Sequence, residues 1–314
     1  MRKITFTAGD DEIGMRLDRA VLFHVEGTSR SRLRQCIEDG FLRVNGLKAK
    51  AAQVLRRGDR VTLDLAPREA PRLEAENIPI RILYQDQWFA LLDKPAGMVV
   101  HPGAGVSGGT LANALAYHFG ELPGADVLRP GIVHRLDKET SGLLLVTLTE
   151  ESQLAFSRLF HDRKLHKEYA ALVHGHLEGR HGRIDKPIGR DPYRRTRMST
   201  RAPNARPCLT EWFVDREYPG FSLLRVVLHT GRTHQIRVHL ASAGHPVAGD
   251  ATYGGNRHLN IRDARLRRAV EGMHRFFLHA WKLGFHHPFT GEDLAFEAPL
   301  PPELVSVLNV LETA

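Results

Sequence analysis

The first 65 residues place apolar side chains first at helical spacing and then in short alternating stretches. Leu17, Val21 and Val25 recur every fourth residue, which predicts a helix over 17–25. A second helix is predicted over 28–40, because this stretch begins with hydroxyl residues suited to an N-cap and ends at a glycine. Two consecutive helices therefore open the chain.

Strand signals follow the two helices. The pair Asn45-Gly46 lies between apolar positions and predicts a tight hairpin turn. Gly58-Asp59 predicts another turn, followed by an alternating strand over 61–65. A stretch rich in proline and acidic residues comes next, which is typical of a domain boundary. We expect a domain at 1–70, a linker at 71–79 and a second domain at 80–314.

The second domain mixes helices and strands without regular strand–helix–strand spacing, which favours the α+β class. Residues 81–97 predict a hairpin, and Thr110 and Gly120 flank a predicted helix. Further along, the pattern predicts a helix at 151–165, strands at 167–177 and 221–230, and a helix ending at Gly244.

Asp137 precedes the apolar run Gly142-Leu143-Leu144-Leu145-Val146, which predicts a short buried strand. An ionised carboxylate next to a core strand is exposed, paired or used in chemistry, because burying it alone costs several kcal/mol. Charged neighbours surround it in the segment HRLDKE. On this stretch alone, a solvated turn with weak local ion pairs explains the pattern slightly better than a reactive site.

Composition narrows the class of protein. The chain has 314 residues, of which 42% are hydrophobic and 25% charged, as in soluble globular proteins of two domains. It contains no apolar run of membrane-spanning length and no apolar signal region at its start, so we expect a cytoplasmic protein. Two distant cysteines, Cys36 and Cys208, support neither a disulfide framework nor a thiolate metal site.

Positive charge is concentrated near the start of the chain. The formal net charge is +8, and residues 13–65 carry +5 of it, with eleven Lys and Arg against six Asp and Glu. Three of these cations stand at the beginning of a predicted helix, where they oppose the helix dipole. A phosphate backbone would explain them better than a solvated helix does. The candidate RNA-binding residues are Arg30, Arg32, Arg34, Arg43 and Arg56.

Motifs for cofactors and metals are not supported. The glycine-rich stretch 103–110 has Gly109 where a phosphate-binding loop needs lysine. His234 and His239 are five residues apart instead of four, and no cysteine cluster accompanies them. We therefore expect neither a metal nor a cofactor.

Three polar residues are predicted to lie in apolar surroundings: Asp137 before one strand, Tyr169 within another and Arg237 on a helix. Taken singly, Tyr169 fits a core tyrosine and Arg237 a surface arginine. Taken together they form a coherent site, because a guanidinium that pairs bidentately with a carboxylate keeps it ionised away from water. An aromatic ring beside them would support a nucleobase.

The longer motifs carry a resemblance to a known family. The segments HPGAG, GIVHRLDKETSGLLLV, KEYAALVHG, KPIGR and TGRTHQIRVHLASAGHPVAGDATYGG resemble the RluA-type family of RNA pseudouridine synthases. The stretches SRSRLRQCI and FLRVNG resemble the S4 RNA-binding domain, which points to the RluD/RluC branch of that family. The resemblance implies a largely antiparallel central sheet with flanking helices, preceded by a small S4-like domain of helix–helix–hairpin form.

The resemblance also implies residue roles. Asp137 corresponds to the catalytic aspartate, Tyr169 to the active-site tyrosine and Arg237 to the basic residue paired with the aspartate. Substrate-binding roles are expected for His134, Arg135, Thr233, His234, Arg194, Arg195 and Arg197. The chain reads Arg206-Pro207-Cys208 where relatives often have Lys-Pro-Ala, so local RNA contacts are expected to differ there.

The implied reaction converts uridine to pseudouridine without a cofactor and needs a base flipped out of its stack. Attack of the carboxylate at C1′, its addition to C6 and a glycal route all stay open. The expected substrate is large-subunit ribosomal RNA, with transfer RNA as the alternative, and the enzyme is expected to act as a monomer without a membrane. Two other classes also stay open: a non-catalytic RNA-binding protein and an RNA nucleosidase, which would release free uracil.

Overall fold

The computed structural model describes residues 2–25, 33, 36–65, 73–103, 105–124, 126–194 and 196–313. The chain divides into two compact units, Met1–Pro71 and Arg72–Ala314, each with its own apolar core. Residues 74–78, expected as part of a linker, are bonded to the second unit. Asn113 Nδ2 donates to Glu74 O over 2.8 Å, and Glu76 N donates to Asn113 O over 3.0 Å.

The first unit is a four-stranded antiparallel sheet with a helix packed against it. The strands are β1 (Arg2–Thr7), β2 (Leu42–Val44), β3 (Leu47–Lys48) and β4 (Arg60–Leu65), in the order β1-β4-β2-β3. Helix α1 (Leu17–His24) buries Leu17, Ala20 and Val21 in the core. The hairpin at Asn45-Gly46 is confirmed, because both residues have positive φ and Val44 pairs with Leu47. Strand β1 was not predicted.

Most of the basic residues expected in this unit lie outside the described part of the chain. Arg30, Arg32 and Arg34 are among them, so their role stays a prediction. Arg43 on β2 and Arg56 before the turn at Gly58 are exposed. Arg43 Nε donates to Gly40 O over 3.3 Å.

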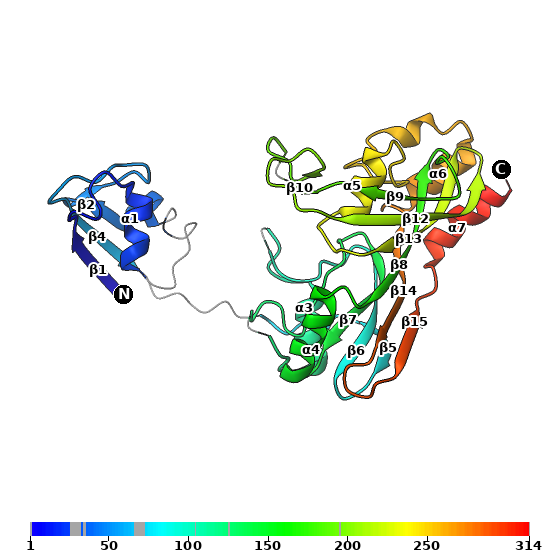
Figure 1. The fold of residues 1–314 in the computed structure, drawn as a ribbon, viewed down its shortest axis with the longest axis horizontal. Helices are drawn as coiled ribbons and strands as arrows, with labels where there is room; N and C mark the ends of the chain where they lie inside the picture. Colours follow the sequence, from blue (N-terminus) through cyan, green and yellow to red (C-terminus); the bar gives the residue numbers. More distant parts are fainter. Residues whose placement is uncertain are drawn as a thin grey trace. The chain divides into compact units, whose positions relative to one another are not determined.

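The second unit is built on a nine-stranded, largely antiparallel sheet, which confirms the α+β class. Its strand order is β5-β6-β7-β14-β8-β13-β12-β9, with β15 paired to β14 (Figure 1). Among the described pairings of this sheet, the one between β7 and β14 is parallel. The strands are β5 (Arg81–Gln85), β6 (Phe89–Lys94), β7 (Ser141–Thr147), β8 (His166–His174), β9 (His181–Asp185), β12 (Leu209–Tyr218), β13 (Phe221–Leu228), β14 (Leu278–His286) and β15 (Asp293–Glu297).

Helices pack near both ends of this sheet. In Figure 1, α3 and α4 lie beside β7, whereas α5, α6 and α7 lie toward the β12–β9 end. Thr110 and Thr149 each form a capping box, at the start of α3 and α4 respectively; the cap at Thr110 was predicted, whereas the one at Thr149 was not. The helices are α3 (Leu111–Phe119), α4 (Glu150–His161), α5 (Gln235–Ser242), α6 (Ala264–Gly272) and α7 (Pro302–Glu312), with a 3-10 turn η1 (Arg257–Asn260).

Strand β7 is buried at every residue and separates two parts of the core. Leu144 and Val146 belong to one apolar cluster, and Leu143 and Leu145 to another. Because alternate side chains of a strand point to opposite faces, both faces of β7 are covered, and this explains its uninterrupted apolar run. The strand that follows Asp137 is therefore a rigid central element.

Gly142 allows β7 and β14 to approach each other. Its φ is 107°, and a Cβ built there would lie 2.2 Å from Ala280 O on β14. Any larger residue would force these two strands apart at the point where they pair in parallel. The glycine thus fixes the sheet directly beside the loop that carries Asp137.

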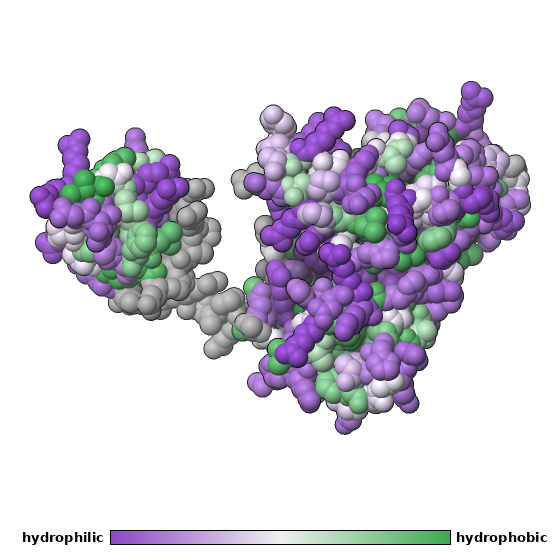
Figure 2. Space-filling model, in the orientation of Figure 1, coloured by the Kyte–Doolittle hydropathy of each residue, from purple (hydrophilic) through white to green (hydrophobic). Residues whose placement is uncertain are grey.

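Two further strands form a short hairpin outside the main sheet. They are β10 (Gly189–Arg190) and β11 (Met198–Ser199), and they belong to a segment, residues 187–207, that we call the arm. The visible face of the second unit is mostly hydrophilic, with hydrophobic residues in small separated patches (Figure 2). None of the helices in the described part of the chain is long and apolar enough to cross a membrane.

Candidate active site

Asp137 lies in the loop between the buried Gly131 and the start of β7. The loop closes on itself, since Thr140 N donates to Asp137 O over 3.1 Å. It is also tied to the segment after β6, because Gly97 N donates to Lys138 O over 2.9 Å. The carboxylate side chain is 16% exposed, so it faces a cavity from a fixed backbone. Rigid elements of this kind are suited to presenting a reactive group.

Lys94 holds this loop in place through hydrogen bonds to backbone carbonyl groups. Its side chain is 1% exposed, and its ammonium donates to Pro95 O, Met98 O and Lys138 O over 2.6, 3.0 and 3.2 Å. Burial, together with the charge of Arg275, lowers the pKa of Lys94 to about 7. The three carbonyl oxygens match the three N–H groups of an ammonium, so the bonds favour its charged form. Lys94 thereby joins the end of β6 to the loop of Asp137.

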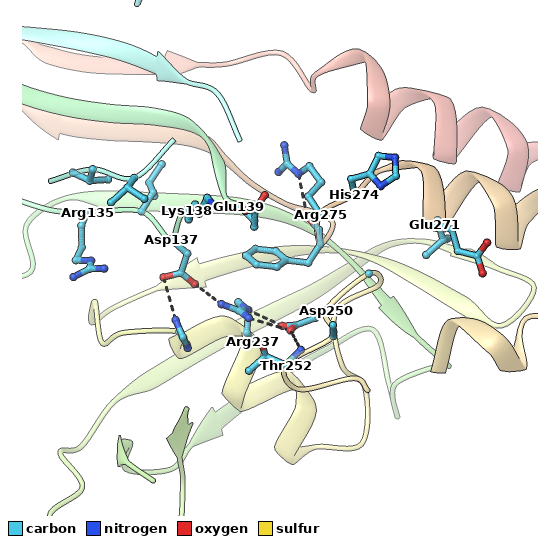
Figure 3. A pocket seen from close by; sticks show the side chains of 18 residues that line it. Arg135, Asp137, Lys138, Glu139, Arg237, Asp250, Thr252, Glu271, His274 and Arg275 are labelled. Atoms are coloured by element: carbon cyan, nitrogen blue, oxygen red, sulfur yellow. Dashed lines mark hydrogen bonds and ion pairs between the residues drawn. The ribbon is translucent and has the colours of Figure 1, made fainter. Parts of the chain in front are cut away.

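Arg237 on α5 is shared by two carboxylates (Figure 3). Its Nη1 donates to Asp137 Oδ2 over 3.0 Å, while Nε and Nη2 donate to Asp250 Oδ2 and Oδ1 over 2.7 and 3.0 Å. The expected pairing of Arg237 with Asp137 is present, but the expectation that it is bidentate is wrong. The bidentate partner is Asp250, whose side chain is 1% exposed.

The guanidinium of Arg237 also packs near two aromatic rings. The ring centroid of Phe276 lies 4.2 Å from its Cζ, and that of Tyr253 lies 5.1 Å away. Burial acts to lower the pKa of Arg237, but the bonds to Asp250 and the charge of Asp137 more than offset it, so the pKa is raised. Arg237 is therefore a permanent cation beside Asp137.

His234 begins α5 in a left-handed conformation, with a φ of 57°. This turn directs its ring back toward the Asp137 loop, where Nε2 lies 4.0 Å from Asp137 Oδ1. On the other side, Nδ1 lies 2.8 Å from the hydroxyl of Tyr253. Burial lowers the pKa of His234, although the charge of Asp137 acts in the opposite direction. The ring is thus neutral near pH 7.

Tyr169 lies on β8 and lines a cavity of about 90 Å³ together with Asp137 and Arg237. Burial, and secondly the negative charge of Asp137, raises the pKa of Tyr169. The phenol therefore stays protonated, so a role as an ionised base is unfavourable. Its ring is placed to pack against a planar group that enters beside the carboxylate.

Two larger cavities flank this small one. A cavity of about 720 Å³ extends from Asp137 past Asp250 to Glu271, His274 and Arg275 (Figure 3). A second cavity of about 530 Å³ lies next to Tyr169, and no carboxylate is among its described lining residues. Its cationic lining residues are Arg129, Arg135, Arg163, Lys167 and Arg232. Such a surface suits a polyanion.

His134 lines the basic cavity and is also bonded to β7. Its Nε2 accepts from Leu145 N over 2.9 Å, and its ring stacks on Phe160 at a centroid distance of 4.6 Å. Burial, helped by the charge of Lys167, lowers the pKa of His134 to about 3. Although His134 lines the basic cavity, its unprotonated ring nitrogen, Nε2, accepts from β7 and so fastens the loop to that strand. It supports the site instead of reaching into it.

The other expected substrate-binding residues are distributed around the cavities. Arg135 is exposed and lines all three of them, and Thr233 is exposed at the small one. Arg194 is exposed on the arm, whereas Arg197 is half-buried with its guanidinium 5.1 Å from the Tyr253 ring. Arg195 lies outside the described residues.

Sequence reasoning missed Lys94, Asp250 and Tyr253. Asp250 and Tyr253 lie in the stretch GDATYGG, where an acidic residue is surrounded by apolar residues and glycines. The same pattern singled out Asp137, so it could also have indicated Asp250 as a site residue. Lys94 at the end of an apolar strand offered a similar signal. Among the described residues, no group of three His, Cys, Asp or Glu side chains is arranged to hold a metal ion.

Comparisons with known proteins give matches over nearly the whole chain. The family model described as RNA pseudouridylate synthase matches residues 89–242. Ribosomal large subunit pseudouridine synthase D of Nitrosomonas europaea is 42% identical over 98% of this chain and 88% of its own length. The protein of the same name from Vibrio parahaemolyticus is 39% identical over 98% of this chain and 94% of its own.

A solved structure is also similar. Human RNA Pseudouridylate Synthase Domain Containing 1 superimposes with a TM-score of 0.56 and 28% identity. The match covers 73% of this chain and 87% of the human chain.

We expect the neutral, buried His134 to make the second unit sensitive to acid. The folded state keeps this ring unprotonated down to about pH 3, whereas the unfolded chain binds the proton near pH 6.5. The free energy of unfolding therefore falls as the pH falls below about 6.5, by up to about 2 kcal/mol from this group between pH 6.5 and 5. In His134→Gln, an amide oxygen can accept from Leu145 N without titrating. Urea unfolding should show a shallower loss of stability between these pH values than in the parent; an equal slope would contradict the assignment.

Arg237→Met should destabilise the second unit strongly. It leaves the buried Asp250 without its cation, and breaking such a pair costs about 3–5 kcal/mol. Arg237→Lys keeps the charge but cannot bridge both carboxylates, so we expect a smaller loss. Chemical unfolding measures both, with Arg194→Met on the exposed arm as the matched control. Equal stability of the Arg237 and Arg194 variants would show that the shared guanidinium contributes nothing to the fold.

Proposed function

The chain belongs to the family of RNA pseudouridylate synthases, and from this premise we propose that it isomerises uridine in large-subunit ribosomal RNA with Asp137 as its catalytic carboxylate. The observation that carries the proposal is the 16% exposed carboxylate of Asp137, paired with Arg237 and facing a cavity shared with Tyr169. The names of the two bacterial relatives support the ribosomal substrate over transfer RNA.

The reaction moves a uracil ring from one bond to another. The N1–C1′ bond breaks, C5 bonds to C1′, the proton on C5 is lost and N1 gains a proton, so no oxidant or water is consumed. Attack at C1′, addition to C6 and the glycal route each need an ionised carboxylate at the sugar or the base. Arg237 Nη1, 3.0 Å from Asp137 Oδ2, places a positive charge beside that carboxylate.

Tyr169 serves in this proposal as a packing surface for the flipped uracil. Its raised pKa keeps the phenol neutral, and its ring lines the same cavity as Asp137. A uridine inside a stack cannot reach this cavity, so the target base must be turned out of its loop or helix. The proton on C5 then leaves to a group other than a tyrosinate.

The basic cavity beside Tyr169 supports the RNA part of the proposal. Its cations, Arg135 among them, lie close enough to the site to contact phosphates that flank the target uridine. The exposed Arg194 places further charge on the arm. We assign phosphate contacts also to Arg43 and Arg56 of the first unit. The S4-like nature of that unit, the cytoplasmic location and the monomeric state stay predictions.

One assay separates the proposed enzyme from the two other classes. RNA that carries tritium at C5 of uridine releases the label when pseudouridine forms, and the base stays bound to the sugar. A non-catalytic RNA-binding protein releases no tritium, and a nucleosidase releases free uracil. Release of tritium without free uracil from ribosomal RNA, but not from transfer RNA, is the result expected for this chain.

Asp137→Asn should abolish tritium release while RNA affinity and stability stay close to those of the parent. The amide keeps the shape of the side chain but removes the charge and the nucleophile, and loss of such a group costs several powers of ten in rate. Asp293→Asn, at a side chain that is 94% exposed on β15, is the matched control and should retain full activity. Substantial turnover by Asp137→Asn would remove the catalytic assignment.

Removal of residues 1–71 should weaken binding to structured RNA and flatten its dependence on salt. Each lost phosphate contact lowers the slope of log K against log salt by roughly one unit or less. The remaining chain has its own core and should stay folded, with tritium release at saturating RNA largely retained. Affinity measured at several salt concentrations checks this. An unchanged slope would exclude the first unit from phosphate binding.

A further inference from the structure

The arm is rooted against the helix that carries the active-site arginine. Its two ends pair with each other, since Ile188 N and Arg206 N each donate to the other residue's carbonyl over 2.9 Å. Ile188, Cys208 and Val238 form a small apolar cluster, against which Met198 and Tyr253 pack. Val238 lies on α5 next to Arg237. The base of the arm and the helix that carries Arg237 therefore pack in one apolar cluster.

Tyr253 connects the two sides of this cluster. Its hydroxyl lies 2.9 Å from Met198 N of the arm and 2.8 Å from His234 Nδ1. Its ring centroid lies 5.1 Å from the guanidinium carbon of Arg197 and, equally, 5.1 Å from that of Arg237. The Tyr253 side chain thus contacts the arm with its hydroxyl oxygen and with its ring. The same oxygen and ring also contact His234 and Arg237 of the active site.

The donors and acceptors can be assigned from the chemistry of the groups. A backbone N–H only donates, so Met198 donates to the phenol oxygen. The phenol oxygen has a second lone pair, and we assign its single proton to the bond with His234 Nδ1, which then accepts. Burial raises the pKa of Tyr253, so the phenol keeps this proton. A neutral His234 that accepts at Nδ1 carries its own proton on Nε2.

This proton faces the catalytic carboxylate. His234 Nε2 lies 4.0 Å from Asp137 Oδ1, the oxygen opposite the one bonded to Arg237. A small rotation of the carboxylate during the reaction brings Oδ1 within hydrogen-bond distance of an N–H donor. With the other tautomer, a lone pair would face Oδ1 and repel it. The remaining charged groups around His234 are Arg135, Arg237 and Asp250.

We propose that Tyr253 is a positioning residue that links the arm to Asp137. It does so by holding His234 in the tautomer whose Nε2 proton points at the carboxylate. The inference rests on the proposed function, because it gives the position of the arm an effect on the same reaction. An arm that is seated on RNA keeps Met198 N against the phenol oxygen. An arm that lifts away releases the phenol, and with it the orientation of His234.

Tyr253→Phe tests this link, because it removes the hydroxyl and keeps the ring between the two guanidinium groups. We expect kcat for tritium release to fall by about tenfold, the effect of one hydrogen bond, with KM within about twofold of the parent. Nitrogen NMR should show His234 as the Nε2–H tautomer in the parent and as a mixture of tautomers in the variant. Tyr117→Phe, at an exposed tyrosine on α3, is the matched control and should change neither quantity.

A double-mutant cycle separates positioning from a general structural effect. His234→Gln presents an amide N–H to Asp137 without a tautomer, so adding Tyr253→Phe to it should lower kcat no further. Additive losses, an unchanged kcat in Tyr253→Phe or an unchanged tautomer would overturn the inference. If the parent itself releases no tritium, the proposed function fails, and the NMR tautomer still decides the link between Tyr253 and His234.

The arm is tested by shortening it. Replacing residues 190–204 with two glycines removes Met198 N while leaving Tyr253 and the pairing of Ile188 with Arg206 in place. We expect the same mixture of His234 tautomers as in Tyr253→Phe, together with a raised KM for RNA. A shortened chain that keeps the single Nε2–H tautomer would show that the arm has no part in orienting His234.

Discussion

The guanidinium of Arg237, buried between the carboxylates of Asp137 and Asp250, is the interaction on which the site depends. Taking three charges out of water costs several kcal/mol per ion, and only close, well-directed hydrogen bonds offset this cost. Three such bonds of 2.7–3.0 Å are present. They require α5, the loop before β7 and the turn at Asp250 to meet at one point. The packing of β7 against β14, made possible by Gly142, holds the loop before β7 in place.

Polar side chains also fasten the Asp137 loop to its surroundings. Lys94 donates to three carbonyl oxygens, Lys138 O of the loop among them, and His134 Nε2 accepts from Leu145 N of β7. A loop that had to be mobile would not need such bonds. Asp137 is therefore presented by a fixed frame, and the adaptable parts of the site are the exposed Arg135, Thr233 and the arm.

Sequence patterns predicted elements and site residues where periodicity or a family motif is strong. They failed where tertiary contacts determine the structure. The hairpin at Asn45-Gly46, the capped helix after Thr110 and the apolar β7 follow from local chemistry. β1, with its alternating pattern, and the C-terminal β14, β15, α6 and α7 were not predicted. The bond between His134 and Leu145 N was not predicted, because a motif does not reveal which backbone group takes a ring nitrogen. The role of Asp250 was missed, because only the fold brings its carboxylate to Arg237.

The division of Arg237 between two carboxylates also has a chemical consequence. The bidentate pair expected for Asp137 would have placed one N–H donor on each of its two oxygens. In the structure the bidentate pair goes to Asp250, which is 1% exposed and takes no part in the cavity's chemistry except through the arginine. Asp137 receives one bond from Arg237, on Oδ2. Because Asp250 takes the other two donors of the guanidinium, Oδ1 is left to face His234 Nε2 at 4.0 Å.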